Sequence, residues 1–251
     1  MPNPLILIVA PIALFFAVRL VQYALLRARG ETIPVDRHAS VSAGSFLLAR
    51  WIQHGFIWAT DPVVKVLRRS RITPNVLTLL CLVFSVTGAV LIAIGEISLG
   101  GAIGFFGSSL DHFDGRLARA LGKESRAGSF LDSVLDRYSD LALSSGAAVF
   151  FRGEVWLLVA CLLNLGSSAV IPYARAKAES LGGSLKTGLM QRPERILLFC
   201  IGAWLSPFLD GLLPAALQGV HLVFSATVVL LACLTTFTAL QRVVIGFSSL
   251  R

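Results

Sequence analysis

Long apolar runs separated by short polar connections form the dominant pattern of this chain. A helix that crosses a membrane needs about 20 mainly apolar residues, and seven segments meet that requirement. We place them at 4–26, 74–95, 98–121, 128–151, 154–179, 194–215 and 219–243. The pattern therefore predicts an all-α protein, a polytopic membrane helix bundle with seven spans.

The composition agrees with a location in lipid. The chain is 55% hydrophobic and 14% charged, with a mean hydropathy of +0.78, whereas soluble domains carry roughly 25% charged residues. The N-terminal Met-Pro-Asn-Pro has no basic region, so we expect no cleaved signal peptide. We interpret the four cysteines as small apolar side chains, because all lie in apolar spans without CxxC spacing: Cys81, Cys161, Cys200 and Cys233.

The basic residues alternate between connections in the way that membrane topology requires. Lys and Arg gather in the connection 27–71, in the loop near 123–126 and in the stretch 175–195, while the intervening turns carry little charge. Because loops rich in Lys and Arg stay in the cytoplasm, we expect the N-terminus outside and the C-terminus inside. Topology thus accounts for the net charge of +8, and we expect no nucleic-acid partner.

We divide the chain into three regions: 1–43, an additional N-terminal transmembrane helix and linker; 44–71, an amphipathic segment; and 72–251, a domain of six spans. Region 44–71 mixes tryptophans with cations, which is typical of a helix in the cytoplasmic interface; a solvated linker is the alternative. We expect Asp61-Pro62 to break this segment in two. The spans show no internal repeat, which disfavours a transporter built from inverted halves.

Four aspartates are the candidates for chemistry. Asp111 and Asp114 are three residues apart, Asp132 and Asp136 are four apart, and each pair shares one face of a helix. A short loop at about 121–127 makes the two helices antiparallel neighbours, so the pairs can face one another at the cytoplasmic end. A carboxylate in the bilayer costs at least ~2.5 kcal/mol and usually marks function. Oxygen ligands alone favour hard ions such as Mg²⁺, Mn²⁺ or Ca²⁺, and two such ions could bridge a diphosphate.

The residues around the aspartates fit a nucleotide diphosphate. Gly115 and Gly128 allow close backbone approach, and Arg119 can clamp a phosphate. The alternative is purely structural: the aspartates would be neutralised by neighbouring arginines, with the glycines serving helix packing. The arginines in question are Arg116, Arg119, Arg126 and Arg137.

The complete spacing D-x2-D-G-x2-A-R-x8-G-x3-D-x3-D resembles the signature of the CDP-alcohol phosphotransferases. It is formed by Asp111, Asp114, Gly115, Ala118, Arg119, Gly128, Asp132 and Asp136. The resemblance covers about residues 60–245, which would supply that family's six spans. It implies a homodimer; Gly100-x3-Gly104 is a weak independent hint of helix association.

The resemblance also implies roles at the matching positions. Asp111, Asp114 and Asp132 would be metal ligands, and Asp136 would be a ligand of the second of two Mg²⁺ or Mn²⁺ ions and the general base. The CDP site would be lined by Gly115, Ala118, Arg119, Ser125, Gly128, Thr73 and Asn75. Thr73-Pro74-Asn75 is also an ordinary helix start, with proline in the first turn.

The acceptor alcohol is expected to bind at the basic stretch 173–195. Its cations either satisfy positive-inside topology or form a pocket for an anionic acceptor, with candidates Arg175, Lys186, Arg192 and Arg195. The pieces Tyr-x-Arg-Ala and Arg-Pro-Glu-Arg resemble the phosphatidylinositol-phosphate synthases and their archaeal archaetidyl counterparts. This resemblance implies transfer of the phosphatidyl group of CDP-diacylglycerol, or an archaeol analogue, to inositol phosphate with release of CMP. Glycerol phosphate is the alternative acceptor, as in a phosphatidylglycerolphosphate synthase.

Two other classes of membrane protein carry intramembrane carboxylates. An ion-coupled transporter would lack the glycine and arginine framing and usually shows repeats. A UbiA-like prenyltransferase would need a second aspartate-rich motif, but after Asp140 the chain has only Asp210.

Overall fold

The computed structural model describes residues 18–19, 21–29, 50–185, 188–214 and 221–250, with the backbone alone at 50–53. Every regular element in these ranges is a helix, as the sequence predicts. A short helical segment at 21–28 precedes α2 (Arg50–Arg69), α3 (Pro74–Ala93), α4 (Ile97–Leu121), α5 (Arg126–Phe150), α6 (Val155–Ser180), α7 (Arg192–Asp210) and α8 (Leu222–Ser249). Most of the predicted first span, 4–26, lies outside the described residues.

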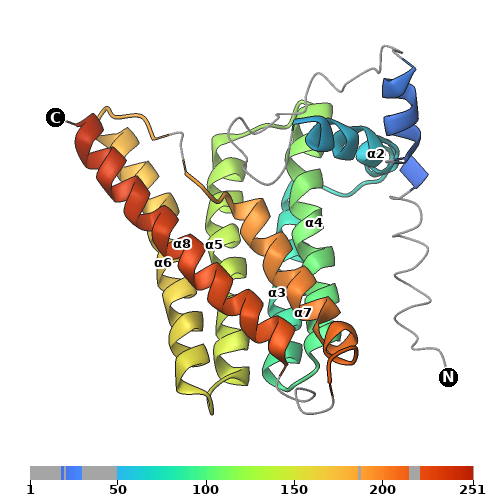
Figure 1. The fold of residues 1–251 in the computed structure, drawn as a ribbon. Coiled ribbons are helices and arrows are strands. Elements are labelled where there is room, and N and C mark those ends of the chain that lie inside the picture. Colours follow the sequence, from blue (N-terminus) through green and yellow to red (C-terminus); the bar gives the residue numbers. More distant parts are fainter. Residues whose placement is uncertain (1–17, 20, 30–49, 186–187, 215–220, 251) are drawn as a thin grey trace.

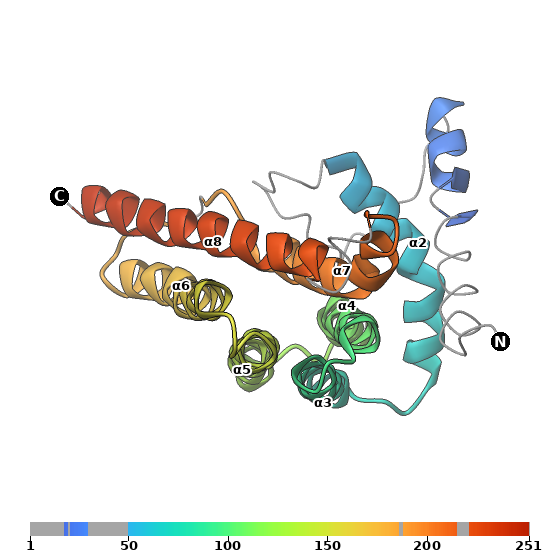
Figure 2. The ribbon, with the colours of Figure 1, turned by 60° about the horizontal axis from the view of Figure 1, so that its bottom comes forward.

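Six long helices, α3 to α8, form the bundle, and α2 lies across one end of it (Figure 1). Seen from below, α3, α4 and α5 are viewed nearly end-on, while α6, α7 and α8 slant across the view (Figure 2). The junction between α4 and α5 lies at the upper end in Figure 1, on the side where α2 sits. This end of the bundle holds the residues singled out in the sequence.

The turn between α4 and α5 is built by two capping residues. Gly122 ends α4 in the left-handed conformation, at φ 62°, which glycine adopts without steric cost. Ser125 begins α5, where its Oγ accepts a hydrogen bond from Gly128 N at 3.0 Å, the usual role of an N-cap serine. The predicted short loop at 121–127 is confirmed. The two helices it joins do not pack along one another as expected, because α4 and α5 both pack on α3.

Three helices, α3, α6 and α8, are long and apolar enough to cross a membrane, so the chain is a membrane protein. The side of α3 turned away from the bundle carries exposed apolar side chains at helical spacing: Val76, Leu79, Val83, Val86 and Val90. Helices α4 and α5 have 25 residues each, or about 38 Å at 1.5 Å per residue. This length is sufficient to span a bilayer, but their aspartates and arginines make them less apolar than α3, α6 and α8.

Glycines bring the helix backbones of the bundle into direct contact. A Cβ added to Gly100 would lie 2.6 Å from Gly88 O on α3, and one added to Gly101 would collide with the backbone of Trp204 on α7. A Cβ at Gly146 of α5 would collide with the backbone of Ala89 on α3. The Gly100-x3-Gly104 motif therefore serves packing of α4 against α3 within the chain, and no longer supports a dimer.

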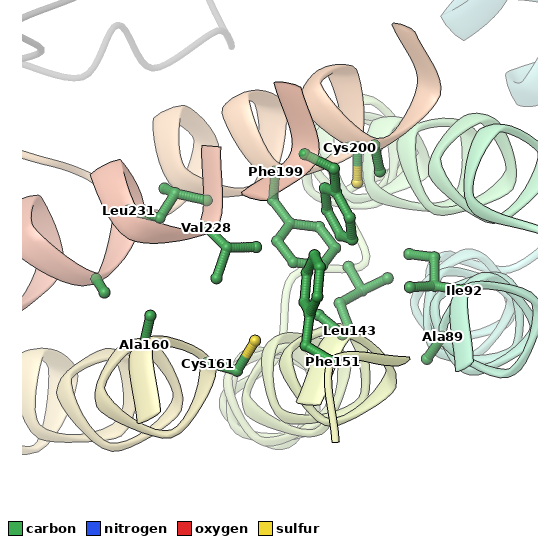
Figure 3. Close-up of a cluster of buried hydrophobic side chains, with 14 of the residues drawn as sticks. Ala89, Ile92, Leu143, Phe151, Ala160, Cys161, Phe199, Cys200, Val228 and Leu231 are labelled. Carbon is green, nitrogen blue, oxygen red and sulfur yellow. The ribbon is translucent and has the colours of Figure 1, made fainter. Parts of the chain in front are cut away.

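The core between the helices is apolar and aromatic (Figure 3). Phe151 stacks on Phe224 at 5.4 Å between ring centroids, and Phe199 meets Phe224 edge-on at 5.6 Å. Cys161 and Cys200 lie in the same core as free thiols, which agrees with their interpretation as small apolar side chains.

Pro62 does not break region 44–71, because α2 continues from Arg50 to Arg69 with the proline inside it. The prediction of a break is therefore wrong. A proline has no N–H to donate to the carbonyl four residues earlier, which here is that of Trp58. Arg19 Nη2 donates to Trp58 O at 3.2 Å, and its guanidinium carbon lies 3.6 Å from the centroid of the Trp58 ring. A cation from the N-terminal segment thus replaces the missing helical donor.

Candidate active site

Three carboxylates from two helices meet at the upper end of the bundle. Asp111 and Asp114 of α4 and Asp132 of α5 each place one oxygen within 4.8 Å of the others. The short turn at 122–125 brings the end of α4 close to the start of α5, and α3 packs on both helices. The predicted meeting of the two pairs is confirmed for these residues.

Asp114 is the most firmly held of the three. Its side chain is buried; Oδ2 accepts from Thr78 Oγ1 on α3 at 2.7 Å, and Oδ1 accepts from Gly115 N at 2.5 Å. Asp132 differs, because its Oδ1 is buried and makes no hydrogen bond with any described residue. A buried acceptor without a donor is costly, so this oxygen is available to a ligand.

These residues fit a divalent metal ion. Carboxylates this close repel one another unless a cation lies between them, and the unpaired oxygen of Asp132 is available as a ligand. A donor set made of oxygen alone favours a hard ion such as Mg²⁺ or Mn²⁺.

Arg192, the first residue of α7, joins the two aspartate helices. Its guanidinium contacts Asp111 of α4 at 2.7 Å and, on α5, Asp136 at 2.9 Å and Asp140 at 3.1 Å. Arg195, one turn further along α7, contacts the second oxygen of Asp140 at 3.4 Å. All these side chains are largely buried, so the ion pairs are shielded from water and salt.

Asp140 was not predicted as a site residue. It lies four residues beyond Asp136, so the two share a face of α5. That spacing was a usable signal, although the family signature itself ends at Asp136.

The other candidates for acceptor binding lie differently. Arg175 is half exposed on α6 and pairs with Glu179 of the same helix at 2.8 Å. Among the described residues it makes no ion pair with the aspartates that Arg192 and Arg195 contact. Lys186 lies outside the described residues.

The candidate CDP-binding residues gather beside the carboxylates. A Cβ at Gly115 would lie 3.5 Å from the Arg119 guanidinium, and one at Gly128 would lie 3.6 Å from Asn75 Oδ1 of α3. The start of α3 therefore approaches the start of α5, as a CDP site shared by Asn75 and Gly128 would require. Arg119 Nε is buried and has no hydrogen bond among the described residues, which suits an anionic ligand.

The remaining candidates are placed as follows. Ala118 is small and half-buried, one turn beyond Asp114. Thr73 precedes α3, and its side chain makes no capping hydrogen bond. Ser125 serves as the N-cap of α5, and its hydroxyl retains a proton to donate. Arg116, considered above as a neutralising partner of the aspartates, instead points toward α2.

The fold and this carboxylate site define a class of membrane transferase. The sequence profile of the CDP-alcohol phosphatidyltransferase family matches residues 71–239, which include the carboxylate cluster, Arg192 and Arg195. The chain belongs to this family and is a CDP-alcohol phosphotransferase.

Curated relatives are consistent in their names. The chain is 35% identical to the phosphatidylinositol phosphate synthase of Mycobacterium tuberculosis over 191 residues, which cover 74% of this chain and 85% of that protein. It is 30% identical to the phosphatidylinositol phosphate synthase of Streptomyces avermitilis over 213 residues, 83% of this chain and 86% of the relative.

Solved structures of the M. tuberculosis enzyme share the fold. Its crystal structure with CDP-DAG bound matches with a TM-score of 0.65 and 33% identity, over 76% of this chain and 94% of that one. Its complex with manganese and citrate matches with a TM-score of 0.66 and 32% identity, over 76% and 90%.

Proposed function

We propose that this chain is a phosphatidylinositol phosphate synthase. It transfers the phosphatidyl group of CDP-diacylglycerol to a hydroxyl of inositol phosphate and releases CMP. Relatives of that name cover most of the chain at 30–35% identity, and one of them has been solved with CDP-DAG bound. The observation in this molecule that carries the acceptor assignment is the pair of buried arginines, Arg192 and Arg195, held on Asp140 beside the carboxylates.

The acceptor is anionic in this proposal because a buried guanidinium nitrogen beside the carboxylates still needs a hydrogen-bond acceptor. Arg195 Nη1 is buried and makes no hydrogen bond with any described residue. A buried guanidinium nitrogen without an acceptor is unfavourable, and a phosphate oxygen would satisfy it with a charge-assisted bond. An uncharged alcohol such as unphosphorylated inositol would leave this nitrogen without an anionic partner.

The aspartates and the candidate CDP-binding residues would bind the donor substrate, CDP-diacylglycerol. Asp111, Asp114 and Asp132 would hold one divalent ion, with Asp136 a ligand of a second. When bound, these ions neutralise the diphosphate and the charge that develops on the leaving CMP. Gly115, Ala118 and Gly128 leave room for the cytidine diphosphate, while Arg119 supplies a cation for it. The manganese complex of the M. tuberculosis relative supports a metal of this type.

The chain's own residues position the acceptor and move its proton. Arg192 and Arg195 would hold the acceptor phosphate and so place a ring hydroxyl next to Asp136. Asp136 accepts the hydroxyl proton, the oxygen attacks the β-phosphorus of CDP-diacylglycerol, and the bond from that phosphorus to the CMP oxygen breaks. The product keeps one phosphodiester, and CMP leaves with the negative charge.

The position of Arg192 is central to this scheme. Its guanidinium lies 2.9 Å from Asp136 and 3.1 Å from Asp140, so it spans the distance between the proposed base and the proposed acceptor site. A phosphate bound by Arg192 would therefore be held within reach of Asp136, as a reaction between two bound substrates requires.

We also propose the membrane arrangement. Helices α3 to α8 would be the six spans, with the carboxylate end at the cytoplasmic side and the C-terminus inside. Helix α2 would lie in the cytoplasmic interface, since Lys65, Arg68 and Arg69 are exposed along it next to the exposed Val66, a pairing typical of interfacial helices. A homodimer remains a family expectation, which native mass spectrometry in detergent would test.

An acceptor screen tests the proposed reaction. Purified enzyme with Mg²⁺ and CDP-diacylglycerol would be offered inositol phosphate, inositol, glycerol phosphate and serine separately, and the lipid product would be identified by mass. We expect a phosphatidylinositol phosphate and an equal amount of CMP from inositol phosphate alone. Turnover of glycerol phosphate in its place would assign the alternative reaction, and turnover of inositol or serine would refute a phosphorylated acceptor.

A further inference from the structure

Arg116 is the largest fully buried side chain among the described residues. It lies between Asp114 and Asp132 in the sequence motif, but its guanidinium contacts α2. A helix turns by about 100° per residue, so Arg116 lies roughly 140° from Asp111 and 160° from Asp114 around α4. It therefore points to the opposite side of the helix from the metal-ligating face.

The partner on that side is α2. Arg116 Nη1 donates to Thr60 Oγ1 at 2.6 Å and to the backbone carbonyl of Ile57 at 3.2 Å, and its Nη2 lies 3.3 Å from Asp61 Oδ1. Thr60 is completely buried. One guanidinium on the catalytic helix thus binds three groups within five residues of α2.

Further contacts support the same junction. His112, one turn before Arg116, meets the Phe56 ring edge-on at 4.8 Å, and its Nε2 lies 3.4 Å from Thr60 Oγ1. An apolar cluster continues the contact between the two helices and α3, formed by Val64, Leu77, Phe113 and Leu117. Packed side chains fix the rotation of a helix about its axis. The seating of α2, together with α3 and α7, which also pack on α4, therefore contributes to where the aspartates of α4 point.

We propose that Arg116, acting through Thr60 and Asp61 of α2, is a positioning residue for the metal-ligating carboxylates Asp111 and Asp114. Helix α2 then serves as the brace of the metal site, on the face of α4 opposite to the ligands. Helix α2 is in turn contacted by the N-terminal segment, because Arg19 donates a hydrogen bond to Trp58 O and lies over the Trp58 ring.

Mn²⁺ affinity of the purified full-length protein in detergent is the decisive measurement. It can be followed by electron paramagnetic resonance of free Mn²⁺ without any substrate, so its outcome does not depend on which acceptor is used. Partners that orient metal ligands typically change metal affinity by about 10- to 100-fold. We expect Thr60→Val and Asp61→Asn each to raise the Mn²⁺ Kd by about 10-fold, and Arg116→Gln by more.

Two comparisons make the test specific. In the double variant Asp61→Asn/Arg116→Gln, the Mn²⁺ Kd should match that of Arg116→Gln alone, because both changes break the same contact. Arg69→Gln is the matched control: it removes a cation from the same helix at an exposed position and should leave the Kd unchanged. Arg116→Lys keeps the charge but not the planar fork and should fall between wild type and Arg116→Gln.

The outcomes separate the possible roles. If folded Thr60→Val and Asp61→Asn proteins bind Mn²⁺ like wild type while only their thermal midpoints fall, Arg116 is merely structural and the proposal is refuted. These two variants answer the question even if Arg116→Gln does not fold. The inference rests on the proposed metal site: a wild-type protein that binds no Mn²⁺ would refute both, whereas a failed acceptor screen would leave this result intact.

Discussion

Asp140→Asn is the change that best tests how the acceptor arginines are held. The carboxylate of Asp140 contacts Arg192 with one oxygen and Arg195 with the other. Asparagine keeps the shape and one acceptor oxygen, but it turns an NH₂ group toward the second guanidinium. The variant therefore loses one charge-assisted hydrogen bond, worth roughly 1.5–3 kcal/mol, and we expect kcat/KM for the acceptor to fall by about 10- to 150-fold.

The assay varies each substrate in turn with the other at saturation. The loss should fall on the acceptor, while the KM for CDP-diacylglycerol stays nearly unchanged, because Asp140 lies on the acceptor side of Asp136. Glu179→Gln is the matched control: it also removes a carboxylate that pairs with an arginine, Arg175, but both side chains are about half exposed. Exposed pairs contribute about 0–1 kcal/mol, so this variant should lose at most about fivefold.

A folded Asp140→Asn enzyme with wild-type acceptor kinetics would refute this reasoning. It would mean that Arg192 and Arg195 either keep their positions without the carboxylate or do not bind the acceptor. An equal loss for both substrates would also contradict it, because it would place the defect in the shared chemistry rather than in acceptor binding.

Three further predictions concern the base, the metal and the packing of the bundle. Asp136→Asn should reduce turnover by at least ~10²-fold while CDP-diacylglycerol binding, measured by equilibrium dialysis, persists; near-normal turnover would remove Asp136 from the mechanism. EDTA should abolish activity, and Mg²⁺ or Mn²⁺ should restore it; rescue by Zn²⁺ alone, or turnover in excess chelator, would contradict an oxygen-ligated site. Gly101→Ala should destabilise the protein by about 1–3 kcal/mol, seen as a lower thermal midpoint, because its Cβ would collide with α7; Gly166→Ala, with no atom within 4 Å of the added carbon, should not.

The local part of the site could be predicted because helix periodicity is short-ranged. Spacings of three and four residues place Asp111 with Asp114, and Asp132 with Asp136, on single faces whatever the rest of the fold does. The short connection at about 121–127 also indicated that the two pairs could meet. The structure confirms this for Asp111, Asp114 and Asp132, and it shows that Gly122 and Ser125 build the turn.

The contacts between distant segments could not be predicted in the same way. Nothing near Pro62 shows that Arg19, 39 residues from Trp58, supplies the donor that the helix lacks. Arg116 lies next to Gly115 in sequence, yet its partners are 55 to 59 residues away. The choice of Arg192 over Arg175 as the cation on the aspartates likewise depends on how α6 and α7 pack, which a single sequence does not reveal.

The bridge made by Arg192 has a consequence for how the protein is made. Asp111, Asp136 and Asp140 all leave the ribosome before the arginine that contacts them, and 52 residues separate Asp140 from Arg192. At roughly 5–20 residues per second, Arg192 is synthesised about 3–10 s after Asp140. During that interval the nascent chain carries a group of carboxylates without the guanidinium that contacts them in the folded protein. A chain cut short before α7 therefore keeps every aspartate of the motif and loses the residue that ties its two helices together.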